Sequence, residues 1–120
     1  MEKEATSIKQ EVIMAAALLT ALSASPESSV EDVSSLLFKL KKAGVQLGDI
    51  GLRRVPGGFY SEDIEALIGH YLAAGYASQT SPVKLTAKGR QLLSEIIGSE
   101  RNDNPQAVEQ IEAVLGPLIV

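Results

Sequence analysis

His70 is the only histidine in the chain and cysteine is absent, which excludes a cysteine nucleophile and a thiolate zinc site, and a metal site would have to combine one imidazole with scattered carboxylates. Asp63 lies seven residues before His70, which is two turns of a helix and too far for a hydrogen-bonded pair of acid and base. No metal-ligand motif is visible, and a solvated surface histidine is the simpler interpretation. The sequence therefore predicts a protein that is not an enzyme, with no catalytic residue, no cofactor and no metal site.

A second group that could do chemistry consists of the glycines on either side of Arg53 and Arg54, because glycine-rich loops can bind phosphate groups. Glycines occupy both ends of residues 48–51 and both positions of residues 57–58. Neither a Gly-Lys-Ser/Thr sequence nor the spacing of a dinucleotide-binding loop is present. Turn formation is therefore the favoured role of these glycines.

The charges are divided unevenly along the chain. Residues 1–35 hold two cations and six acids, residues 36–90 hold eight cations and four acids, and residues 91–120 hold one cation and five acids. A basic middle can mark a surface for phosphates, although solvated helix faces produce similar local excesses. The candidate nucleic-acid-binding residues are Arg53, Arg54, Lys84, Lys88 and Arg90.

The elements that must position these residues belong to one small domain. A chain of 120 residues with 45% hydrophobic and 22% charged residues has the size and composition of a single globular unit, here residues 1–120. The apolar run over residues 12–19 is preceded by more acids than cations and is shorter than the roughly 18 apolar residues of a membrane span. We therefore expect a cytoplasmic protein with no membrane partner.

Helical periodicity dominates the chain, so the expected fold class is mainly α with a small β-hairpin and about five helices. Helices are expected over residues 6–24, 29–43, 61–74, 86–98 and 105–115, and a hairpin is expected over residues 76–85. Residues 44–60 indicate a long, partly buried connection with room for a short strand or a helical turn. Residues 99–104 indicate a polar break.

Capping residues and apolar stripes predict how the second and third helices are placed. Ser28 and Glu31 have the spacing of a capping box at the start of the second helix, and Ser61 can cap the third. The predicted inward face of the third helix is Ile64, Leu67, Ile68, Tyr71 and Leu72. Its predicted outward face is Glu62, Asp63, Ala66, Gly69, His70 and Ala73.

The first and last helices are candidate dimerisation elements. Residues 12–19 are apolar all round, and the last helix has one apolar face before an apolar C-terminus. A helix of the first kind must be covered on more than one side, either inside its own fold or at a subunit interface. We expect a homodimer through residues 1–24 and 104–120, with docking onto the chain's own core as the alternative.

The segments Leu72-Ala73-Ala74-Gly75-Tyr76 and Leu85-Thr86-Ala87-Lys88-Gly89-Arg90-Gln91-Leu92-Leu93 flank the expected hairpin. Over roughly residues 60–95 this order resembles the winged-helix superfamily, in particular bacterial regulators of the multiple-antibiotic-resistance and phenolic-acid-repressor families. The resemblance implies a winged-helix-like domain and a dimeric, DNA-binding transcriptional regulator. Its recognition helix would correspond to residues 61–74 and its wing to residues 76–85.

Two features depart from that pattern and keep a second function open. The 17 residues from 44 to 60 replace the turn of about three or four residues that joins the helices of a helix-turn-helix. The outward face of the third helix has no lysine or arginine with which to contact phosphates or base edges. The small residues Ala66, Gly69 and Ala73 would instead permit a close approach by a partner helix. The alternatives are a nucleic-acid-associated regulator and a protein-interaction module.

Overall fold

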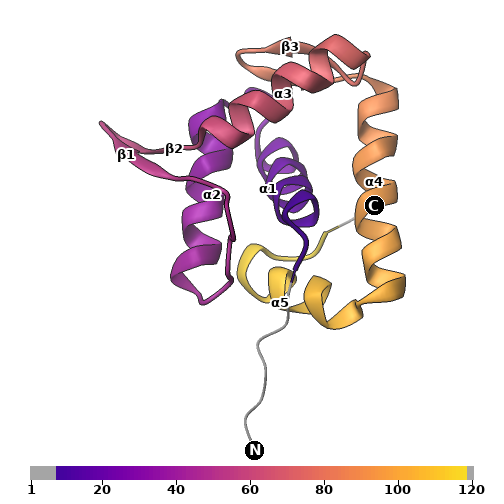
Figure 1. The fold of residues 1–120 in the computed structure, drawn as a ribbon. Helices are drawn as coiled ribbons and strands as arrows, with labels where there is room; N and C mark the ends of the chain where they lie inside the picture. The colour runs from indigo at the N-terminus through magenta and orange to yellow at the C-terminus, as the bar shows by residue number, and fades with distance from the viewer. Residues whose placement is uncertain (1–7, 119–120) are drawn as a thin grey trace, which may run out of the picture.

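The computed structural model describes residues 8–118, which fold into five helices and two short antiparallel hairpins (Figure 1). The helices are α1 (Gln10–Ala24), α2 (Val30–Lys42), α3 (Glu62–Ala74), α4 (Ala87–Asp103) and α5 (Pro105–Leu115). The strands are β1 (Arg53–Val55), β2 (Gly58–Tyr60), β3 (Ala77–Thr80) and β4 (Val83–Leu85). The predicted class, mainly α with a small hairpin, is confirmed, and a second hairpin lies within residues 44–60.

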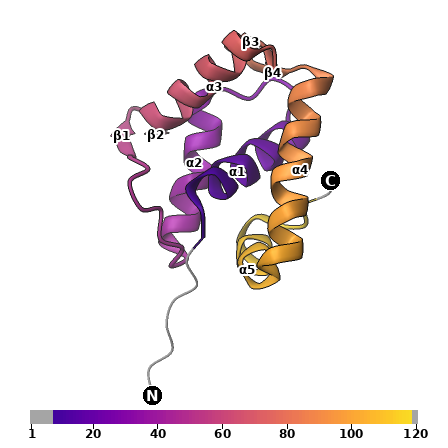
Figure 2. The ribbon, with the colours of Figure 1, turned by 45° about the vertical axis from the view of Figure 1, so that its right-hand side comes forward.

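Helix α1 occupies the centre of the fold, where α2, α4 and α5 pack against it (Figures 1 and 2). Ala16, Ala17 and Leu18 are successive residues and so point about 100° apart around the helix, and each is 0% exposed. Burial inside one chain therefore explains the all-round apolar pattern of residues 12–19. The described helix begins at Gln10, after Ile8 and Lys9, and the predicted start at residue 6 lies outside the described residues.

Helix α5 packs on its own chain as well. Ala107, Val108 and Ile111 are fully buried, and α5 contacts α1, α2 and α4. The apolar faces that motivated a homodimer through residues 1–24 and 104–120 are thus covered, over their described parts, by the chain itself. The homodimer remains a prediction, for which the mass in solution is the measurement.

The capping box of α2 lies one residue later than the sequence spacing predicted. The Ser29 side chain accepts a hydrogen bond from the Asp32 amide at 3.1 Å, and the Asp32 carboxylate accepts one from the Ser29 amide at 2.9 Å. Ser28 is instead buried, with its hydroxyl 2.9 Å from the carbonyl oxygens of both Ala21 and Ser25. The Ser28 hydroxyl therefore hydrogen-bonds to the C-terminal end of α1 and does not cap α2.

The connection between α2 and α3 contains the hairpin of β1 and β2. Pro56 and Gly57 form its two-residue turn, in which Gly57 has a φ of 89°, as the third position of a type II turn requires. The Phe59 ring stacks on Phe38 of α2, with ring centroids 3.9 Å apart. The strands are only three residues long, and so short a hairpin is not stable by itself. The stack on α2 therefore anchors it to the body of the protein.

The β3–β4 hairpin corresponds to the predicted wing, and its end is attached to the body of the protein. The Val83 amide donates a hydrogen bond of 2.9 Å to the Ser28 carbonyl in the connection between α1 and α2. At the other end, the Thr86 amide donates to the Tyr76 carbonyl at 3.0 Å, and the Thr86 hydroxyl donates to the Gly75 carbonyl at 2.7 Å. The hairpin is therefore held at both ends.

Helix α4 runs to Asp103, so the polar break predicted at residues 99–104 and the helix end predicted at residue 98 are wrong. Gly98 lies inside the helix and is exposed, where glycine costs about 1 kcal/mol relative to alanine but does not stop a helix. Ile97 and Glu100 are buried on the inner side and continue the packed face. The helix ends only where Pro105 starts α5.

Three hydrogen bonds, one of which is also an ion pair, connect α4 and α5 to the end of the described chain. The Glu112 carboxylate accepts from the Leu118 amide at 2.8 Å and from Arg101 at 3.3 Å, and Arg101 also donates to the Leu118 carbonyl at 2.9 Å. The Leu118 amide and the Arg101 guanidinium lower the pKa of Glu112, against the opposing effect of burial. The ionised carboxylate is therefore the form that the fold stabilises.

We expect the stabilisation by Glu112 to be lost in acid. A lowered pKa in the folded state contributes stability above the ordinary pKa of about 4.3, and this is lost as the pH falls through the folded value. The difference in free energy of unfolding between wild type and Glu112→Gln should therefore shrink when urea unfolding is measured from about pH 6 to about pH 3. Glu109→Gln, at an exposed position of the same helix, is the control. A difference independent of pH would contradict this assignment.

Candidate interaction surfaces

Helix α3 presents one face to the core and one to solvent. Ser61 caps the helix by accepting from the Ile64 amide at 3.3 Å, and Ile64, Ile68 and Tyr71 are buried. Leu72, predicted to point inward, is 45% exposed. The ring of Tyr71, edge-on to Tyr76, fills the inward position at this level, so the next residue turns towards solvent.

The solvent face of α3 has the composition that the sequence predicted. The predicted residues Glu62, Asp63, Ala66, Gly69, His70 and Ala73 are all exposed, as is Glu65. The first turn is therefore acidic and the rest of the face is small, with Leu72 beside it. Within α3 there is no lysine or arginine.

Two of the acidic side chains at the start of α3 have partners on the preceding segment. Asp63 accepts a hydrogen bond from the Gly51 amide at 2.6 Å, and Glu62 lies 3.6 Å from the Arg53 side chain. Helical spacing predicts only that Asp63 lies in the first turn, and no local signal points to its contact with Gly51 twelve residues earlier. Asp63 thus also fixes the path of the connection into β1.

Arg53 and Arg54 lie together on β1, each over an aromatic ring of β2. The Arg53 guanidinium is 4.9 Å from the centroid of the Tyr60 ring, and that of Arg54 is 5.3 Å from the centroid of Phe59. Both pairs are directly opposite in the strand register. Stacking orients the two guanidinium groups, and the Arg53 side chain remains 59% exposed.

The other three predicted cations lie at the opposite end of α3. Lys84 is on β4, while Lys88 and Arg90 are in the first turns of α4. The Lys88 ammonium is 5.0 Å from the centroid of the Tyr76 ring. The two hairpins flank α3 along the chain, and a helix of 13 residues is about 20 Å long, so an acidic helix separates the two groups of cations (Figure 1).

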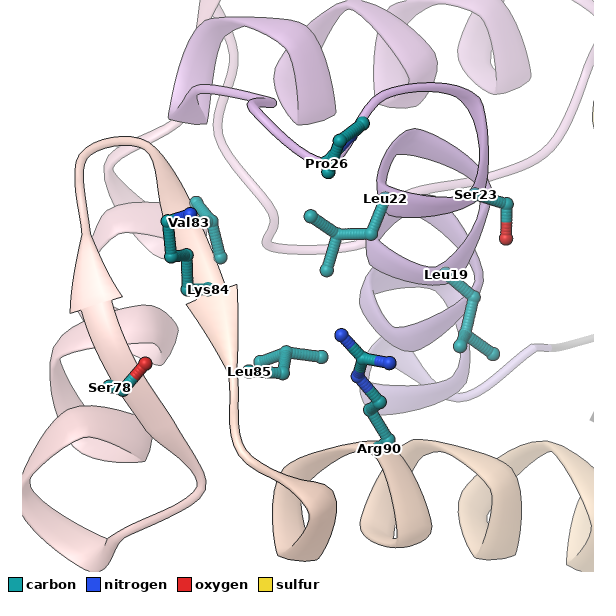
Figure 3. Close-up of a pocket in the computed structure, with 9 residues that line it drawn as sticks. All are labelled: Leu19, Leu22, Ser23, Pro26, Ser78, Val83, Lys84, Leu85 and Arg90. Atoms are coloured by element: carbon teal, nitrogen blue, oxygen red, sulfur yellow. The ribbon is translucent and has the colours of Figure 1, made fainter.

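A groove lies between the C-terminal half of α1, the β3–β4 hairpin and the start of α4. Its volume is about 450 Å³, and Leu19, Leu22, Lys84, Leu85 and Arg90 are among the residues that line it (Figure 3). Figure 3 shows the Arg90 side chain rising from α4 into the space between Leu85 and α1. Lys84 and Arg90 both line this groove, on separate walls, whereas Lys88 does not line it.

The titratable groups of the described residues offer little chemistry beyond charge. Burial, with the Glu11 carboxylate and Tyr76 as smaller causes, raises the pKa of Tyr71, and burial with the nearby Glu65 raises that of Tyr60. Both phenols therefore stay protonated at neutral pH. Among residues 8–118, no group of three or more acidic, histidine or cysteine side chains is arranged to hold a metal ion.

Comparison with known proteins leaves the chain without an assigned relative. No protein-family model, no curated protein and no solved structure matches it. Within the part of the chain that the structure describes, no helix is both long and apolar enough to cross a lipid bilayer.

Proposed function

We propose that the chain is a non-enzymatic protein-interaction module with a winged-helix-like order of elements, and that it binds its partner through the solvent face of α3. The observation that carries this proposal is the composition of that face, which is acidic at its start, small along its length and apolar at Leu72. The helix that would read DNA in a winged-helix regulator thus offers carboxylates where phosphates would lie.

The placement of the other candidate contacts also favours this function over DNA binding. The five predicted cations form two groups separated by the length of α3, and Arg53 is paired with Glu62. The β3–β4 hairpin is hydrogen-bonded to the connection between α1 and α2, so it is not free to extend into a groove of DNA. The separation of Arg53 and Arg54 from Lys84, Lys88 and Arg90 therefore supports a protein partner more than a DNA duplex.

The chemistry of the face suggests what kind of protein surface it binds. Ala66, Gly69 and Ala73 allow a partner backbone to approach closely, and Leu72 offers an apolar contact. Glu65 and its neighbours in the first turn favour cations on the partner. We therefore propose a partner segment that combines small or apolar residues with lysine or arginine at one end.

Site-specific crosslinking tests the interaction module. A photoreactive amino acid at Ala66 or Ala73 should crosslink to one protein in cells, whereas the same group at exposed Gly98 on α4 should not. The crosslink from Ala73 should disappear in an Ala66→Arg background, because a long charged side chain cannot enter a close-packed interface without cost. Equal crosslinking from all three positions would contradict the proposal.

Duplex DNA binding separates the module from the alternative, a nucleic-acid-associated regulator. On the proposed function, fluorescence anisotropy should detect no saturable binding of a labelled duplex even at low salt. A regulator would bind it, with an affinity that falls by about 0.9 log units per log unit of salt for each phosphate contact. Such binding, lost when Lys84, Lys88 and Arg90 are all changed to Glu and retained in Ala66→Arg, would establish the regulator instead.

Light scattering of the same variants addresses the homodimer. A dimer through residues 1–24 and 104–120 should keep its mass in Ala66→Arg, whereas a dimer through α3 should become a monomer. If the wild-type protein is a monomer, the partner of the α3 face would be a different protein and not a second copy of this chain.

A further inference from the structure

The groove between α1, the β3–β4 hairpin and α4 has the size and lining of a small-molecule site. Its volume of about 450 Å³ falls within the range of about 300 to 1,000 Å³ that is typical of ligand pockets. Leu19, Leu22 and Leu85 line it and are only partly buried, and Val83 forms a buried part of its wall. An apolar body placed there would remove these side chains from water.

Two cations border the apolar walls without a carboxylate beside them. In residues 8–118, neither Lys84 nor Arg90 has an ion pair within 4.0 Å or a side-chain hydrogen bond, whereas Arg53 and Arg101 each have a carboxylate partner. Figure 3 shows the Arg90 guanidinium over the groove, near Leu19 and Leu22. A planar guanidinium beside an apolar wall is suited to bind a carboxylate through two parallel hydrogen bonds.

We infer that this groove binds a small amphipathic carboxylate, with its hydrocarbon body against Leu19, Leu22 and Leu85 and its headgroup at Arg90. Five of the nine lining residues are aliphatic, namely Leu19, Leu22, Pro26, Val83 and Leu85, and they offer a hydrocarbon body contacts that a sugar-phosphate backbone would not use. The inference concerns a surface formed by α1, β4 and α4 and does not depend on the proposed role of α3.

Octanoate is a suitable probe, with octanamide as its neutral counterpart and acetate as the headgroup alone. Isothermal titration calorimetry should show saturable binding of one octanoate per chain, at least tenfold tighter than that of octanamide or acetate. Heteronuclear NMR spectra should place the shifts at residues 19–23, 83–85 and 90. Binding of octanamide as tight as that of octanoate would remove the role of the cations and overturn the inference.

Matched variants test the two parts of the site. Arg90→Gln should weaken octanoate binding about tenfold or more, while Lys88→Gln, which removes the same charge from the same helix outside the groove, should leave it unchanged. Ser23→Phe places a large ring at an exposed position of the groove and should abolish binding without unfolding the protein, as thermal unfolding would verify.

Further outcomes would also overturn the inference. They are the absence of saturable octanoate binding by folded wild-type protein, equal weakening by Arg90→Gln and Lys88→Gln, and NMR shifts located away from the groove. Displacement of octanoate by a short DNA duplex in an Arg90-dependent manner would likewise show that the cations serve nucleic acid and not a small carboxylate.

Discussion

Gly89→Ala is expected to lower the free energy of unfolding by about 3 kcal/mol or more, although alanine is the better helix former. Gly89 is buried in the first turn of α4, where its amide donates to the Thr86 side chain at 3.1 Å. A Cβ atom at this position would overlap the backbone carbonyl of Tyr76. That carbonyl accepts from the Thr86 amide, so relieving the overlap would separate α4 from the β3–β4 hairpin.

Gly98 provides the control, because it lies in the same helix with no atom within 4 Å of the position that a Cβ would take. Gly98→Ala should raise the free energy of unfolding by about 0.5 to 1 kcal/mol, through helix propensity alone. Urea unfolding followed by circular dichroism measures both variants. A Gly89→Ala protein as stable as wild type would show that the approach of Tyr76 to α4 is not rigid.

Ser34→Ala is expected to cost about 2 kcal/mol, because it leaves a buried amide without a partner. The Ser34 hydroxyl donates to the Val30 carbonyl at 2.7 Å and accepts from the Ser61 amide at 2.9 Å. Ser34 and Ser61 are both 0% exposed, so water cannot replace the lost bond without opening the contact between α2 and the start of α3.

Ser35 is the matched control for this prediction. Its hydroxyl donates to the Glu31 carbonyl at 3.0 Å in the same pattern along α2, but the residue is exposed and its bond lies on the surface. Ser35→Ala should therefore change the free energy of unfolding by no more than about 0.5 kcal/mol. Thermal unfolding measures both variants. If Ser34→Ala and Ser35→Ala lowered the free energy of unfolding equally, the bond between Ser34 and Ser61 would contribute nothing to stability.

Periodicity and capping predicted the order and number of the helices because those signals are local. The inward residues Ile64, Ile68 and Tyr71 of α3 follow from helical spacing alone, as does the start of α5 at Pro105. The β1–β2 hairpin could not be predicted in the same way. Its strands have three residues each, and the stack of Phe59 on Phe38 that holds them is a long-range contact.

The details that the sequence predicted wrongly are those in which two registers are locally equivalent. Ser28 and Ser29 each precede an acidic residue by three positions, and only the burial of Ser28 against the end of α1 decides which of them caps α2. Similarly, a helix can stop or continue at Gly98, and the buried side chains beyond it decide that α4 continues. Tertiary packing, which a sequence pattern does not contain, settles both.

The candidate site was predictable in composition but not in arrangement. The acidic and small face of α3 follows from helical spacing, and the structure places those residues in solvent. The placement of Lys84 and Arg90 on the walls of one groove, and the separation of both from Arg54, depend on how the two hairpins are placed around α3. No spacing along the chain encodes that placement.

The central position of α1 has a consequence for how the protein is made. Ribosomes synthesise this helix first, yet α4 and α5, which complete its cover, are synthesised last. At about 5 to 20 residues per second, the nascent chain carries an uncovered apolar helix for several seconds. Interrupted translation products that end before α5 should therefore aggregate or be retained by chaperones, because α1 stays partly uncovered in them.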